Sequence, residues 1–404
     1  MGKKNLPVNW VLKKMPEVVK WGSGGTPKAT EKSYYENGTI PWLVIGDLNN
    51  GVVMESATKI TELGLQSSSA KMVPKGTLLV AMYGSIGKLG ITGIDCCTNQ
   101  AIAYAKELHG VTTKYMYYYM SMMKPELISK GKGGTQKNIS QTVLNSLDVI
   151  VPPIAEQERI VARIEELFSQ LDKAVETLQM VKEQLVNYRQ TAITSAFPKQ
   201  TKENSMRLDE IANITGGITK GRKLEGKETV RLPYLRVANV QNGYLDLAEM
   251  KEIELKVDEI DKYLLQYGDV LYTEGGDRDK LGRGTIWKNE MENCVHQNHI
   301  FKARLDKNKA IPQYVAYWSM ATPARNYFYS KGKQSVNLAS INKTILSNLV
   351  LPIPTLEEQH RTIKNIEERL VVADYINAAI EKTLNQAESM RQSILKQAFE
   401  GELV

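Results

Sequence analysis

Cysteine is scarce in this chain of 404 residues, and long apolar runs are absent from it. The cysteines are Cys96, Cys97 and Cys294. They form no CxxC motif and are too few for a disulfide framework, so the sequence fits a reducing compartment. No run of about 18 apolar residues occurs, and the opening residues, MGKKNLPVNW, lack the apolar stretch of a signal peptide. We therefore expect a cytoplasmic protein that is neither secreted nor membrane-spanning.

The motifs of several enzyme classes are missing as well. No Gly-Lys pair is followed by Ser or Thr, which excludes a Walker A loop for nucleotide hydrolysis. No Asn precedes any of the 14 prolines, which excludes the Asn-Pro-Pro-aromatic motif of amino-group DNA methyltransferases. His296 and His299 form an HxxH pattern without the glutamate of a zinc protease helix, and we interpret them as strand-end histidines. We expect no catalytic residue, no metal site and no cofactor in this chain.

Net charge, composition and length narrow the classes of protein that remain possible. The formal net charge is +7 with a pI near 8.9, which favours an anionic partner such as nucleic acid. Hydrophobic residues make up 42% of the chain and charged residues 24%, so the chain is globular rather than disordered. A length of 404 residues suits two or three domains.

The longest regular pattern is an apolar stripe between Ile154 and Phe197. Its positions alternate in steps of four and three residues, which is typical of a coiled-coil seam. No Gly or Pro interrupts it. About forty helical residues make a rod roughly 60 Å long, and such a rod needs a second helix to bury its stripe. The predicted seam residues are Ile160, Ile164, Leu167, Leu171, Ala174, Leu178, Val181, Leu185 and Tyr188.

A second stretch, residues 354–399, supplies that helix. Pro152, Glu156-Gln157 and Ala196-Phe197 recur 202 positions later as Pro354, Glu358-Gln359 and Ala398-Phe399. Thr355 and Glu358 form a capping-box pattern that marks the helix start. Its predicted seam is Ile363, Ile366, Leu370, Ala373, Asn377, Ile380, Leu384 and Ala387. Asn377 is either a solvated flank residue or a residue that sets the register of the pair.

The repeat extends over the whole half-chain. Residues 42–51 (WLVIGDLNNG) resemble residues 234–243 (YLRVANVQNG), and 129–132 (SKGK) recur at 330–333. The spacing between matching segments grows from 192 to 202 residues, so the second half carries insertions, in and after the segment 274–284. The sequence predicts four segments: a globular domain at 1–153, a long helix at 154–199, a second globular domain at 200–353 and a second long helix at 354–404.

Both globular segments read as β-rich with some helix, so the predicted fold class is α+β. Short apolar runs bounded by Gly, Asn and Pro predict strands at 77–82, 102–105, 269–273 and 300–303. Residues 115–123 and 312–320 predict short helices, and apolar segments at 147–151 and 349–353 close the globular parts. We expect the two long helices to pair as an antiparallel coiled coil that relates the halves by an approximate two-fold axis.

Basic, amide-bearing and glycine-rich loops occur at matching places in both halves. Lys and Arg neutralise phosphates, while Gln, Asn and Arg can contact base edges in the major groove. Any single loop is also compatible with an ordinary solvated turn, but the repetition favours DNA contact. The candidates are Lys28, Tyr34, Lys88, Lys130, Lys132, Thr135, Gln136, Lys137 and Asn138, and then Lys220, Arg222, Lys223, Arg278, Lys280, Arg283, Lys331, Lys333, Gln334 and Asn337.

Several of these motifs together resemble the specificity subunit of type I restriction–modification enzymes. The resemblance covers nearly the whole chain, and its most specific part is the doubled Pro…Glu-Gln start of the long helices. The residues that carry it are 151–157 (VPPIAEQ), 351–359 (LPIPTLEEQ), 24–27 (GGTP) with 40–43 (IPWL), 99–102 (NQAI), 279–284 (DKLGRG) and 398–403 (AFEGEL). The second half has Ile-Pro-Thr at 353–355, where Pro-Pro is more usual in the family.

The resemblance implies a non-catalytic subunit that binds double-stranded DNA. Two target-recognition domains would each read one half of a bipartite, asymmetric site, with the helices as a fixed spacer. The helices would also dock methyltransferase subunits, two of them by expectation, and through these the restriction subunits. S-adenosylmethionine, ATP and Mg²⁺ would belong to those partners. Two other classes stay open on the residues alone: a free-standing nuclease or methyltransferase, and a coiled-coil adaptor that contacts only protein.

Overall fold

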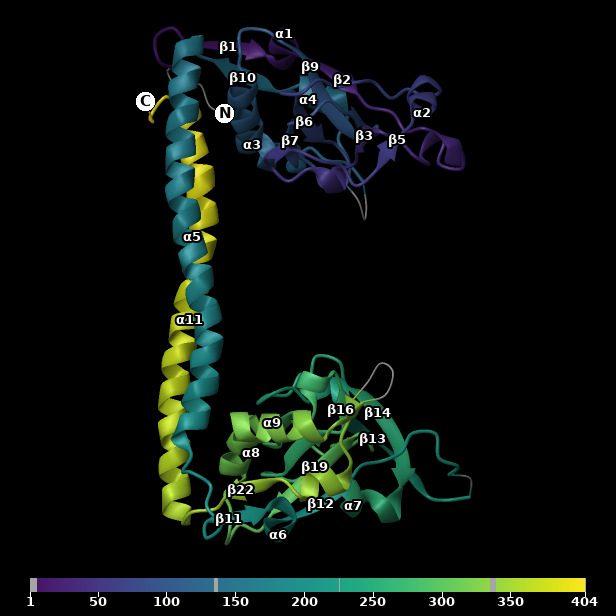
Figure 1. Ribbon diagram of the computed structural model, residues 1–404, viewed down its shortest axis with the longest axis vertical. Coiled ribbons are helices and arrows are strands. Elements are labelled where there is room, and N and C mark those ends of the chain that lie inside the picture. The colour runs from purple at the N-terminus through teal and green to yellow at the C-terminus, as the bar shows by residue number, and fades with distance from the viewer. Residues whose placement is uncertain (1–5, 134–136, 225, 335–338, 404) are drawn as a thin grey trace. The chain divides into compact units, whose positions relative to one another are not determined.

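The computed structural model describes residues 6–133, 137–224, 226–334 and 339–403. The chain divides into two compact units: unit 1 comprises Met1–Thr177 with Lys382–Val404, and unit 2 comprises Leu178–Glu381. Two long helices, α5 (Ile154–Ala196) and α11 (Leu356–Phe399), contribute residues to both units (Figure 1). Both predicted rods are therefore confirmed.

Unit 1 is built on a five-stranded sheet. Its order is β2 (Val19–Ser23), β9 (Ile102–Leu108), β6 (Leu78–Ala81), β7 (Leu89–Thr92) and β4 (Val52–Val53). A smaller sheet has the order β5 (Lys59–Ile60), β3 (Ile40–Leu43) and β8 (Cys97–Thr98), and β1 (Val11–Lys14) pairs with β10 (Asp148–Val151). The helices are α1 (Met15–Val18), α2 (Glu62–Gln66), α3 (Thr113–Ser129) and α4 (Gln141–Asn145). The main core lies between the large sheet and α3.

Unit 2 repeats this topology. Its main sheet has the order β12 (Ala212–Gly216), β19 (Ile300–Leu305), β15 (Val270–Thr273) and β17 (Gly284–Ile286). The smaller sheet is β14 (Lys251–Lys256), β13 (Thr229–Leu235) and β18 (Val295–His296), and β11 (Ser205–Arg207) pairs with β22 (Val350–Pro352). A short sheet adds β16 (Gly275–Gly276), β21 (Ala339–Ser340) and β20 (Lys333–Gln334). The helices are α6 (Leu208–Ile211), α7 (Ile260–Tyr263), α8 (Pro312–Met320), α9 (Thr322–Lys331) and α10 (Lys343–Ser347).

The predicted strands and the two closing segments are confirmed as β6, β9, β15, β19, β10 and β22, and the second short helix is α8. The first short helix was predicted to end at Met123, but α3 runs on through Pro125 to Ser129. A proline inside a helix removes one hydrogen bond and crowds the preceding turn. Met123 and Leu127, on either side of it, are both buried in the core, and this packing outweighs the local preference.

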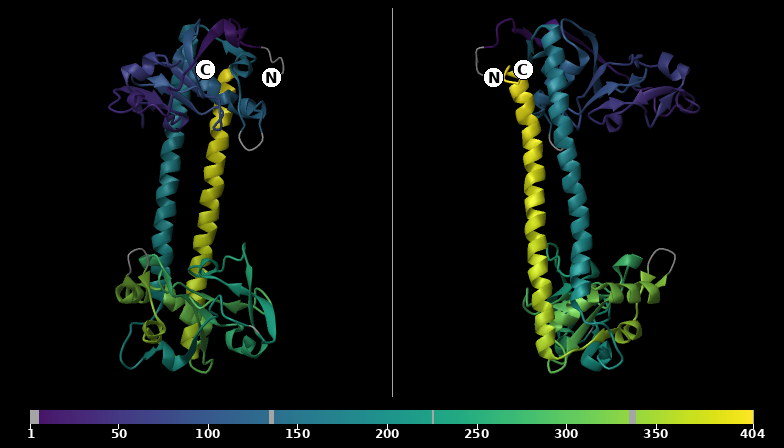
Figure 2. Two further views of the ribbon diagram at one scale, coloured as in Figure 1. Left: turned by 90° about the vertical axis from the view of Figure 1, so that its right-hand side faces the viewer. Right: turned by 60° about the vertical axis from the view of Figure 1, so that its left-hand side comes forward.

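The long helices pair in opposite directions within each unit. In unit 1 the first turns of α5 lie beside the last turns of α11, and in unit 2 the last turns of α5 lie beside the first turns of α11 (Figure 2). Matching ion pairs link the two helices: Arg391 with Asp172 in unit 1, and Arg189 with Asp374 at 2.5 Å in unit 2. The capping box at Thr355 is also present, because the Thr355 N–H donates to Glu358 Oε2 over 3.0 Å and the Glu358 N–H donates to Thr355 Oγ1 over 3.3 Å.

The α5 seam departs from the strict pattern after Leu171. Ala174, Val181 and Tyr188, which the alternation assigned to the seam, are exposed, whereas Val175, one residue further on, is partly buried. A straight helix drifts by about 20° per heptad, so the buried stripe moves by one residue along a long rod. The other predicted α5 residues are buried or half-buried: Ile160, Ile164, Leu167, Leu171, Leu178 and Leu185.

The α11 seam keeps its predicted alternation throughout. Ile363, Ile366, Leu370, Ala373, Ile380, Leu384 and Ala387 are buried or half-buried. Asn377 falls between Ala373 and Ile380 and is itself half-buried, so it lies in the seam rather than on a solvated flank. Its amide sits where a hydrophobic residue would pack, as expected of a residue that sets register.

Each helix ends on a phenylalanine that completes a core. Phe399, at the end of α11, packs edge-on against Tyr115 and Tyr119 of α3, with ring centroids 5.2 and 5.0 Å away. Phe197, one residue after α5, packs edge-on against Tyr314 and Trp318 of α8 at 5.0 and 5.1 Å. The repeated Ala-Phe pair therefore closes unit 1 from the C-terminal end of the chain and unit 2 from its middle.

A buried titratable cluster distinguishes unit 2 from unit 1. His296 is fully buried in β18, where Nδ1 lies 2.9 Å from the Ile300 carbonyl oxygen and Nε2 has no partner among the described residues. Burial lowers the pKa of His296 to about 4, and the nearby Lys302 ammonium adds to the effect. Burial also lowers the pKa of Lys302 to about 8. Thr98 is the matching residue of β8 in unit 1.

Unit 2 is therefore expected to lose stability in mild acid. Because the pKa of His296 lies below its usual 6.5 in the folded state, only the unfolded chain binds this proton between pH 6.5 and about 4. Stability should fall as the pH falls through this window, by up to about 3 kcal/mol. Hydrogen exchange of β18 and β19 peptides against pH should show the loss, and His296→Asn, which keeps an amide donor for Ile300, should remove it. An unchanged pH profile in that variant would contradict the assignment.

Candidate nucleic-acid interface

The topology of unit 1 brings three loops to one edge of its main sheet. In the antiparallel register Ser23 lies opposite Ala103, and Ala81 lies opposite Ile102. The end of β2, the end of β6 and the start of β9 therefore share one edge. Loops 24–31, 82–88 and 99–101 leave from it. We call this set, together with residues 130–133 and 137–139 of the returning segment, the loop edge of unit 1.

Unit 2 has the same edge built from matching strands. Gly216 lies opposite Phe301, and Thr273 lies opposite Ile300. Loops 217–223, 274–283 and 297–299 therefore leave from one edge of the four-stranded sheet. With residues 331–334 and 339–341 of the returning segment they form the loop edge of unit 2. Loop 274–283 is three residues longer than loop 82–88, so one of the predicted insertions lies in this edge.

The returning segments are tied to the sheet by matching hydrogen bonds. The Ile139 N–H donates to the Met82 carbonyl, and the Ile341 N–H donates to the Glu274 carbonyl, each over 2.8 Å. In unit 1 the Gly84 N–H also donates to Asn138 Oδ1 over 3.2 Å. The basic segments that follow α3 and α9 are thus held against the loops that follow β6 and β15.

A glycine permits the close approach of two loops in each unit. A Cβ atom on Gly24 would collide with the Thr98 carbonyl oxygen, and one on Gly217 would collide with the His296 carbonyl oxygen. Loops 24–31 and 217–223 can therefore cross the turn before β9 or β19 only with glycine at these positions. Gly84 and Gly87 have positive φ angles, which glycine adopts without strain, so loop 82–88 can turn tightly.

The candidate DNA-contact lysines of unit 1 differ in whether they already have a partner in the protein. Lys132 and Lys137 are exposed on the returning segment, and within the described ranges neither has an ion-pair partner. Lys130 pairs with Glu126 at 2.9 Å. Lys88 is half-buried, and its Nζ donates to the Ile45 and Gly46 carbonyls over 3.2 and 3.3 Å, so it fastens loop 82–88 to loop 44–50.

Lys28 and Tyr34 lie further out, beside the small sheet of unit 1. The Lys28 ammonium pairs with Glu31 at 3.2 Å. The Tyr34 carbonyl accepts the Thr61 N–H over 2.9 Å, which ties this segment to the start of α2. Lys28 belongs to loop 24–31 of the loop edge, whereas Tyr34 lies outside the loops that form it.

In unit 2 the arginines are held by neighbours. Arg283 Nη1 donates to Gln241 Oε1 over 2.8 Å. Arg278 stacks over the Tyr329 ring at 4.4 Å and donates to the Tyr329 carbonyl over 3.2 Å. Arg222 pairs with Glu259 at 2.9 Å and is only about a quarter exposed, so it stabilises the fold.

The lysines of unit 2 are more exposed. Lys220, Lys223, Lys331 and Lys333 have no ion-pair partner within the described ranges, while the half-buried Lys280 pairs with Asp277. Three other predicted residues, Thr135, Gln136 and Asn337, lie outside the described residues, as does the side chain of Gln334.

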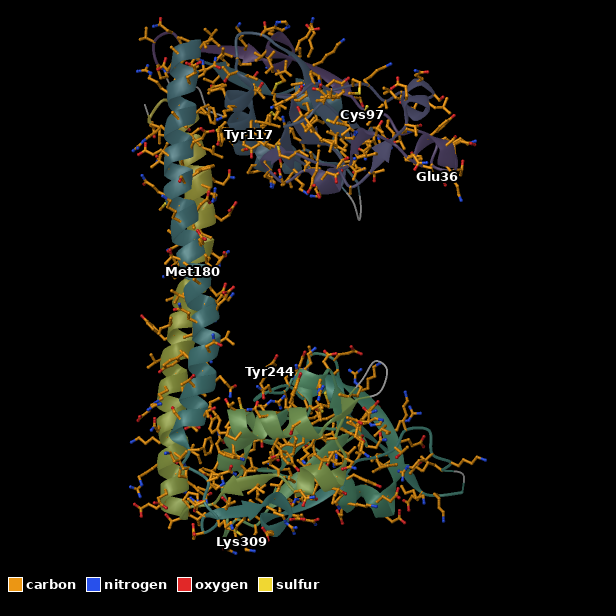
Figure 3. The ribbon with its side chains drawn as sticks, in the orientation of Figure 1. Glu36, Cys97, Tyr117, Met180, Tyr244 and Lys309 are labelled. Atoms are coloured by element: carbon orange, nitrogen blue, oxygen red, sulfur yellow. The ribbon has the colours of Figure 1, made fainter. Side chains whose placement is uncertain are left out.

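Residues outside the candidate set also occupy the loop edges. Asn99 and Gln100 in unit 1, and Gln297, Asn298 and His299 in unit 2, fill the turns before β9 and β19. Tyr244, 61% exposed, follows Gln241, and Figure 3 shows it at the opposite end of unit 2 from Lys309. The repeated Asn and Gln at these turns were visible in the sequence, but only the strand register shows that they share an edge with the basic loops.

A buried glutamine anchors each long helix at its start. Gln157 Oε1 accepts the Thr112 N–H over 3.0 Å, and its Nε2 donates to the Gly110 and Pro152 carbonyls, each over 2.9 Å. Gln359 repeats all three bonds. Its Oε1 accepts from Ile311 N over 2.8 Å, and its Nε2 donates to the Lys309 and Pro354 carbonyls over 3.0 and 2.9 Å. These glutamines fix each helix to the turn before α3 or α8.

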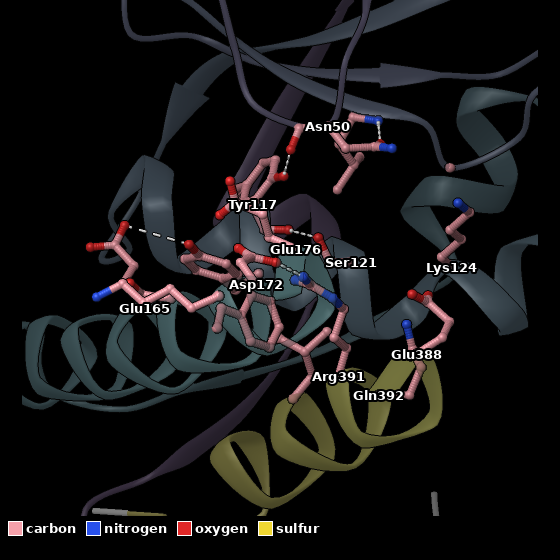
Figure 4. Close-up of a pocket in the computed structure, with 17 residues that line it drawn as sticks. Asn50, Tyr117, Ser121, Lys124, Glu165, Asp172, Glu176, Glu388, Arg391 and Gln392 are labelled. Carbon is pink, nitrogen blue, oxygen red and sulfur yellow. Dashed lines mark hydrogen bonds and ion pairs between the residues drawn. The ribbon is translucent and has the colours of Figure 1, made fainter. Parts of the chain in front are cut away.

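Unit 1 also has a pocket of about 600 Å³ between α3 and its parts of the long helices. Figure 4 shows Arg391 beside Asp172 and Tyr117 beside Asn50 at this pocket. The Arg391 guanidinium also lies 4.9 Å from the centre of the Phe168 ring. Aromatic, acidic and basic side chains line the pocket, a mixture suited to a protein side chain rather than to a phosphate.

The described residues also bear on metal binding, thiol chemistry and membrane insertion. Among them, no group of three or more His, Cys, Asp or Glu side chains could hold a metal ion. The cysteines are buried, and burial raises the pKa of Cys96 and Cys294 to about 12 and that of Cys97 to about 11, so all three stay as unreactive thiols near neutral pH. Within the described ranges, no helix combines the length and apolar composition that crossing a membrane requires.

Comparison with known proteins finds the same two-fold repeat over nearly the whole chain. The family model described as type I restriction modification DNA specificity domain matches twice, at residues 7–183 and 201–387. The chain is 22% identical over 423 residues to the type I restriction enzyme EcoKI specificity subunit of Escherichia coli strain K12, covering 100% of this chain and 91% of that protein. It is 23% identical to the StySPI specificity subunit of Salmonella potsdam, with the same coverage.

Solved structures share the fold. One, described as the structural basis of complex assembly and conformational transition of the type I R-M system, aligns with a TM-score of 0.72 at 18% identity, covering 99% of this chain and 100% of that one. The HsdS subunit from Thermoanaerobacter tengcongensis aligns with a TM-score of 0.58 at 19% identity, covering 100% of this chain and 99% of that one.

Proposed function

The chain belongs to the type I restriction–modification DNA specificity family, and we propose that it reads a bipartite, asymmetric DNA sequence for a multisubunit enzyme. Each loop edge would contact one half of the site, and the paired helices would set the spacing between the halves. The observation that carries this proposal is the repetition of one polar loop edge, on one topology, in two units with different side chains. Two similar readers with different contacts suit an asymmetric site.

The loop edges combine the two chemistries that DNA recognition needs. Exposed lysines without ion-pair partners, such as Lys132 in unit 1 and Lys333 in unit 2, can neutralise phosphates. The amides at the turns before β9 and β19 can reach base edges. Arg278 and Arg283 are held by Tyr329 and Gln241, so they reach DNA in a fixed orientation with little entropy left to lose.

Partner subunits would supply the catalysis. We propose that two methyltransferase subunits bind along the long helices and recruit restriction subunits. S-adenosylmethionine, ATP and Mg²⁺ would be bound by these partners and none by this chain, which would work in the cytoplasm. In unit 2, α11 exposes a small apolar group on the side away from its seam, formed by Val371, Val372, Tyr375 and Ile376. In unit 1, the pocket beside Arg391 offers a second contact surface.

Reconstitution tests the proposal directly. The purified chain, with DNA, labelled S-adenosylmethionine and Mg²⁺, should neither methylate nor cleave. Adding the methyltransferase subunit should give methylation at a two-part sequence, read out by methylome sequencing of a host that carries both genes. Methyl transfer by the chain alone would overturn the non-catalytic role, and methylation at a single continuous sequence would overturn the two-reader model.

Removing the lysines of the unit 1 loop edge should weaken binding to every DNA sequence alike. In the complex with methyltransferase, the double variant Lys132→Ala, Lys137→Ala should lower the slope of log affinity against log salt by about 2, because each lysine releases about one counterion. The preferred sequence should not change. Fluorescence anisotropy over a salt series measures the slope.

A matched control keeps the charge change and moves it away from the loop edge. Lys75 precedes the start of β6 and Lys106 lies in the second half of β9, and both are exposed. The variant Lys75→Ala, Lys106→Ala should leave the slope within experimental error. If both double variants lower the slope equally, binding reflects overall charge and not this edge.

A further inference from the structure

One side-chain pair sits at the loop edge of unit 2 with no counterpart in unit 1. Glu274 directly follows β15, and His299 directly precedes β19. Their side chains meet, with His299 Nδ1 2.6 Å from Glu274 Oε2. The His299 side chain is 53% exposed and that of Glu274 is 29% exposed, so both face solvent at the edge.

The backbone does not need this pair. The Glu274 N–H donates to the His299 carbonyl over 2.9 Å, and the Glu274 carbonyl accepts the Ile341 N–H over 2.8 Å. In unit 1 the same two bonds are made by Met82, with Ala101 and with Ile139, each over 2.8 Å. Met82 and Ala101 are buried apolar residues. In unit 1 a methionine and an alanine support the same loop connection. The Glu274–His299 side-chain pair of unit 2 therefore has a role other than holding this loop in place.

The charge of Glu274 argues against a phosphate contact. A carboxylate repels the DNA backbone, and its oxygens can only accept hydrogen bonds. The groups in the major groove that donate hydrogen bonds are the exocyclic amines, N4 of cytosine and N6 of adenine. An acceptor among basic loops that track the backbone is therefore placed to read a base.

We propose that Glu274 reads an exocyclic amine of adenine or cytosine in the half-site bound by unit 2, and that His299 is its positioning residue. This rests on the proposed function. The His299 Nδ1–H holds Oε2 and fixes the carboxylate plane, and Oε1, which has no partner within the described ranges, is left for the base amine. Unit 1 has no acceptor side chain at the matching positions, which Met82 and Ala101 occupy.

Motif selection with the methyltransferase complex tests this assignment. In Glu274→Ala, one position of the unit 2 half-site should lose its preference for adenine or cytosine, by about 5-fold to about 150-fold, while the unit 1 half-site stays unchanged. His299→Ala should relax the same position less, and His299→Gln, which keeps a donor for Oε2, should restore part of the preference. Glu274→Gln keeps the size of the side chain and removes its charge. If the alanine variant folds poorly, this variant tests the base preference at the same position of the half-site.

The matched control is a second histidine–glutamate pair away from the loop edge. His109 Nε2 lies 3.6 Å from Glu107 Oε2 near the far end of β9, and both side chains are exposed. His109→Ala should leave both half-sites unchanged. Tighter binding of Glu274→Ala to all sequences, with every position of the motif preserved, would show that the carboxylate only repels DNA and would overturn the inference. A wild-type complex that selects no bipartite motif would instead overturn the proposed function itself.

Discussion

Phe399→Ala should destabilise unit 1 by about 3–5 kcal/mol and leave unit 2 unaffected, although Phe399 follows unit 2 in the sequence. The ring is fully buried against Tyr115 and Tyr119, so truncation leaves a cavity between α3 and the end of α11. Hydrogen-exchange mass spectrometry can follow peptides of α3 and α8 separately. Protection should fall in α3 and persist in α8.

Phe197→Ala is the matched variant, with the opposite expected pattern. Phe197 packs against Tyr314 and Trp318, so its loss should weaken α8 and spare α3. The effect should be somewhat smaller, because Phe197 is 9% exposed and Phe399 is not exposed at all. Equal loss of protection in both helices, in either variant, would contradict the separate closure of the two cores.

Gln157→Ala should cost about 3 kcal/mol or more and loosen the junction between α3 and α5. Three hydrogen bonds of the buried Gln157 side chain, one of them fully buried and two partly buried, are lost together, and the Thr112 N–H and the Gly110 and Pro152 carbonyls lose their partner. Each buried polar group without a partner costs about 1–3 kcal/mol. Chemical denaturation, combined with hydrogen exchange of residues 110–116, measures both effects.

Gln157→Glu separates hydrogen bonding from packing. The carboxylate keeps the size of the amide and can accept from the Thr112 N–H, but it cannot donate to either carbonyl. It should therefore destabilise unit 1 although no cavity forms. Gln359→Glu should do the same to unit 2, since its Nε2 faces the Lys309 and Pro354 carbonyls. If either substitution is neutral, the glutamines are not anchors.

Much of the fold could be predicted because the sequence contains the same domain and helix pattern twice. The doubled Pro…Glu-Gln and Ala-Phe pairs marked the ends of both long helices, and local apolar patterns marked β6, β9, β15 and β19. Each of these local patterns is a weak signal alone, but their occurrence at matching places in both halves indicated one architecture. Beyond Leu171 the α5 seam was wrong at Ala174, Val181 and Tyr188, because a strict heptad pattern ignores the slow drift of a straight helix, while Leu178 and Leu185 were confirmed.

The roles of individual residues depended on contacts between distant segments. Gln157 was predicted as part of a repeat, but two of its three partners, Thr112 and Gly110, lie 45 and 47 residues earlier, in a turn that sequence patterns do not connect to it. The ion pair of Arg222 could not be predicted either, because Glu259 lies 37 residues further on. Glu274, in contrast, carries no sequence signal for DNA contact, because a carboxylate does not bind phosphate, and only the structure places it beside His299.

Unit 1 is formed by two segments that lie far apart in the sequence, and this has a consequence for synthesis of the protein. Its core includes Ile394, Leu395, Ala398 and Phe399, which leave the ribosome only after the whole of unit 2. All of Leu178–Glu381 must be translated first. At roughly 5–20 residues per second this takes on the order of 10–40 s. During that interval the aromatic face of α3 has no Phe399 to cover it, so the first unit to emerge as a nascent chain is the last to finish folding.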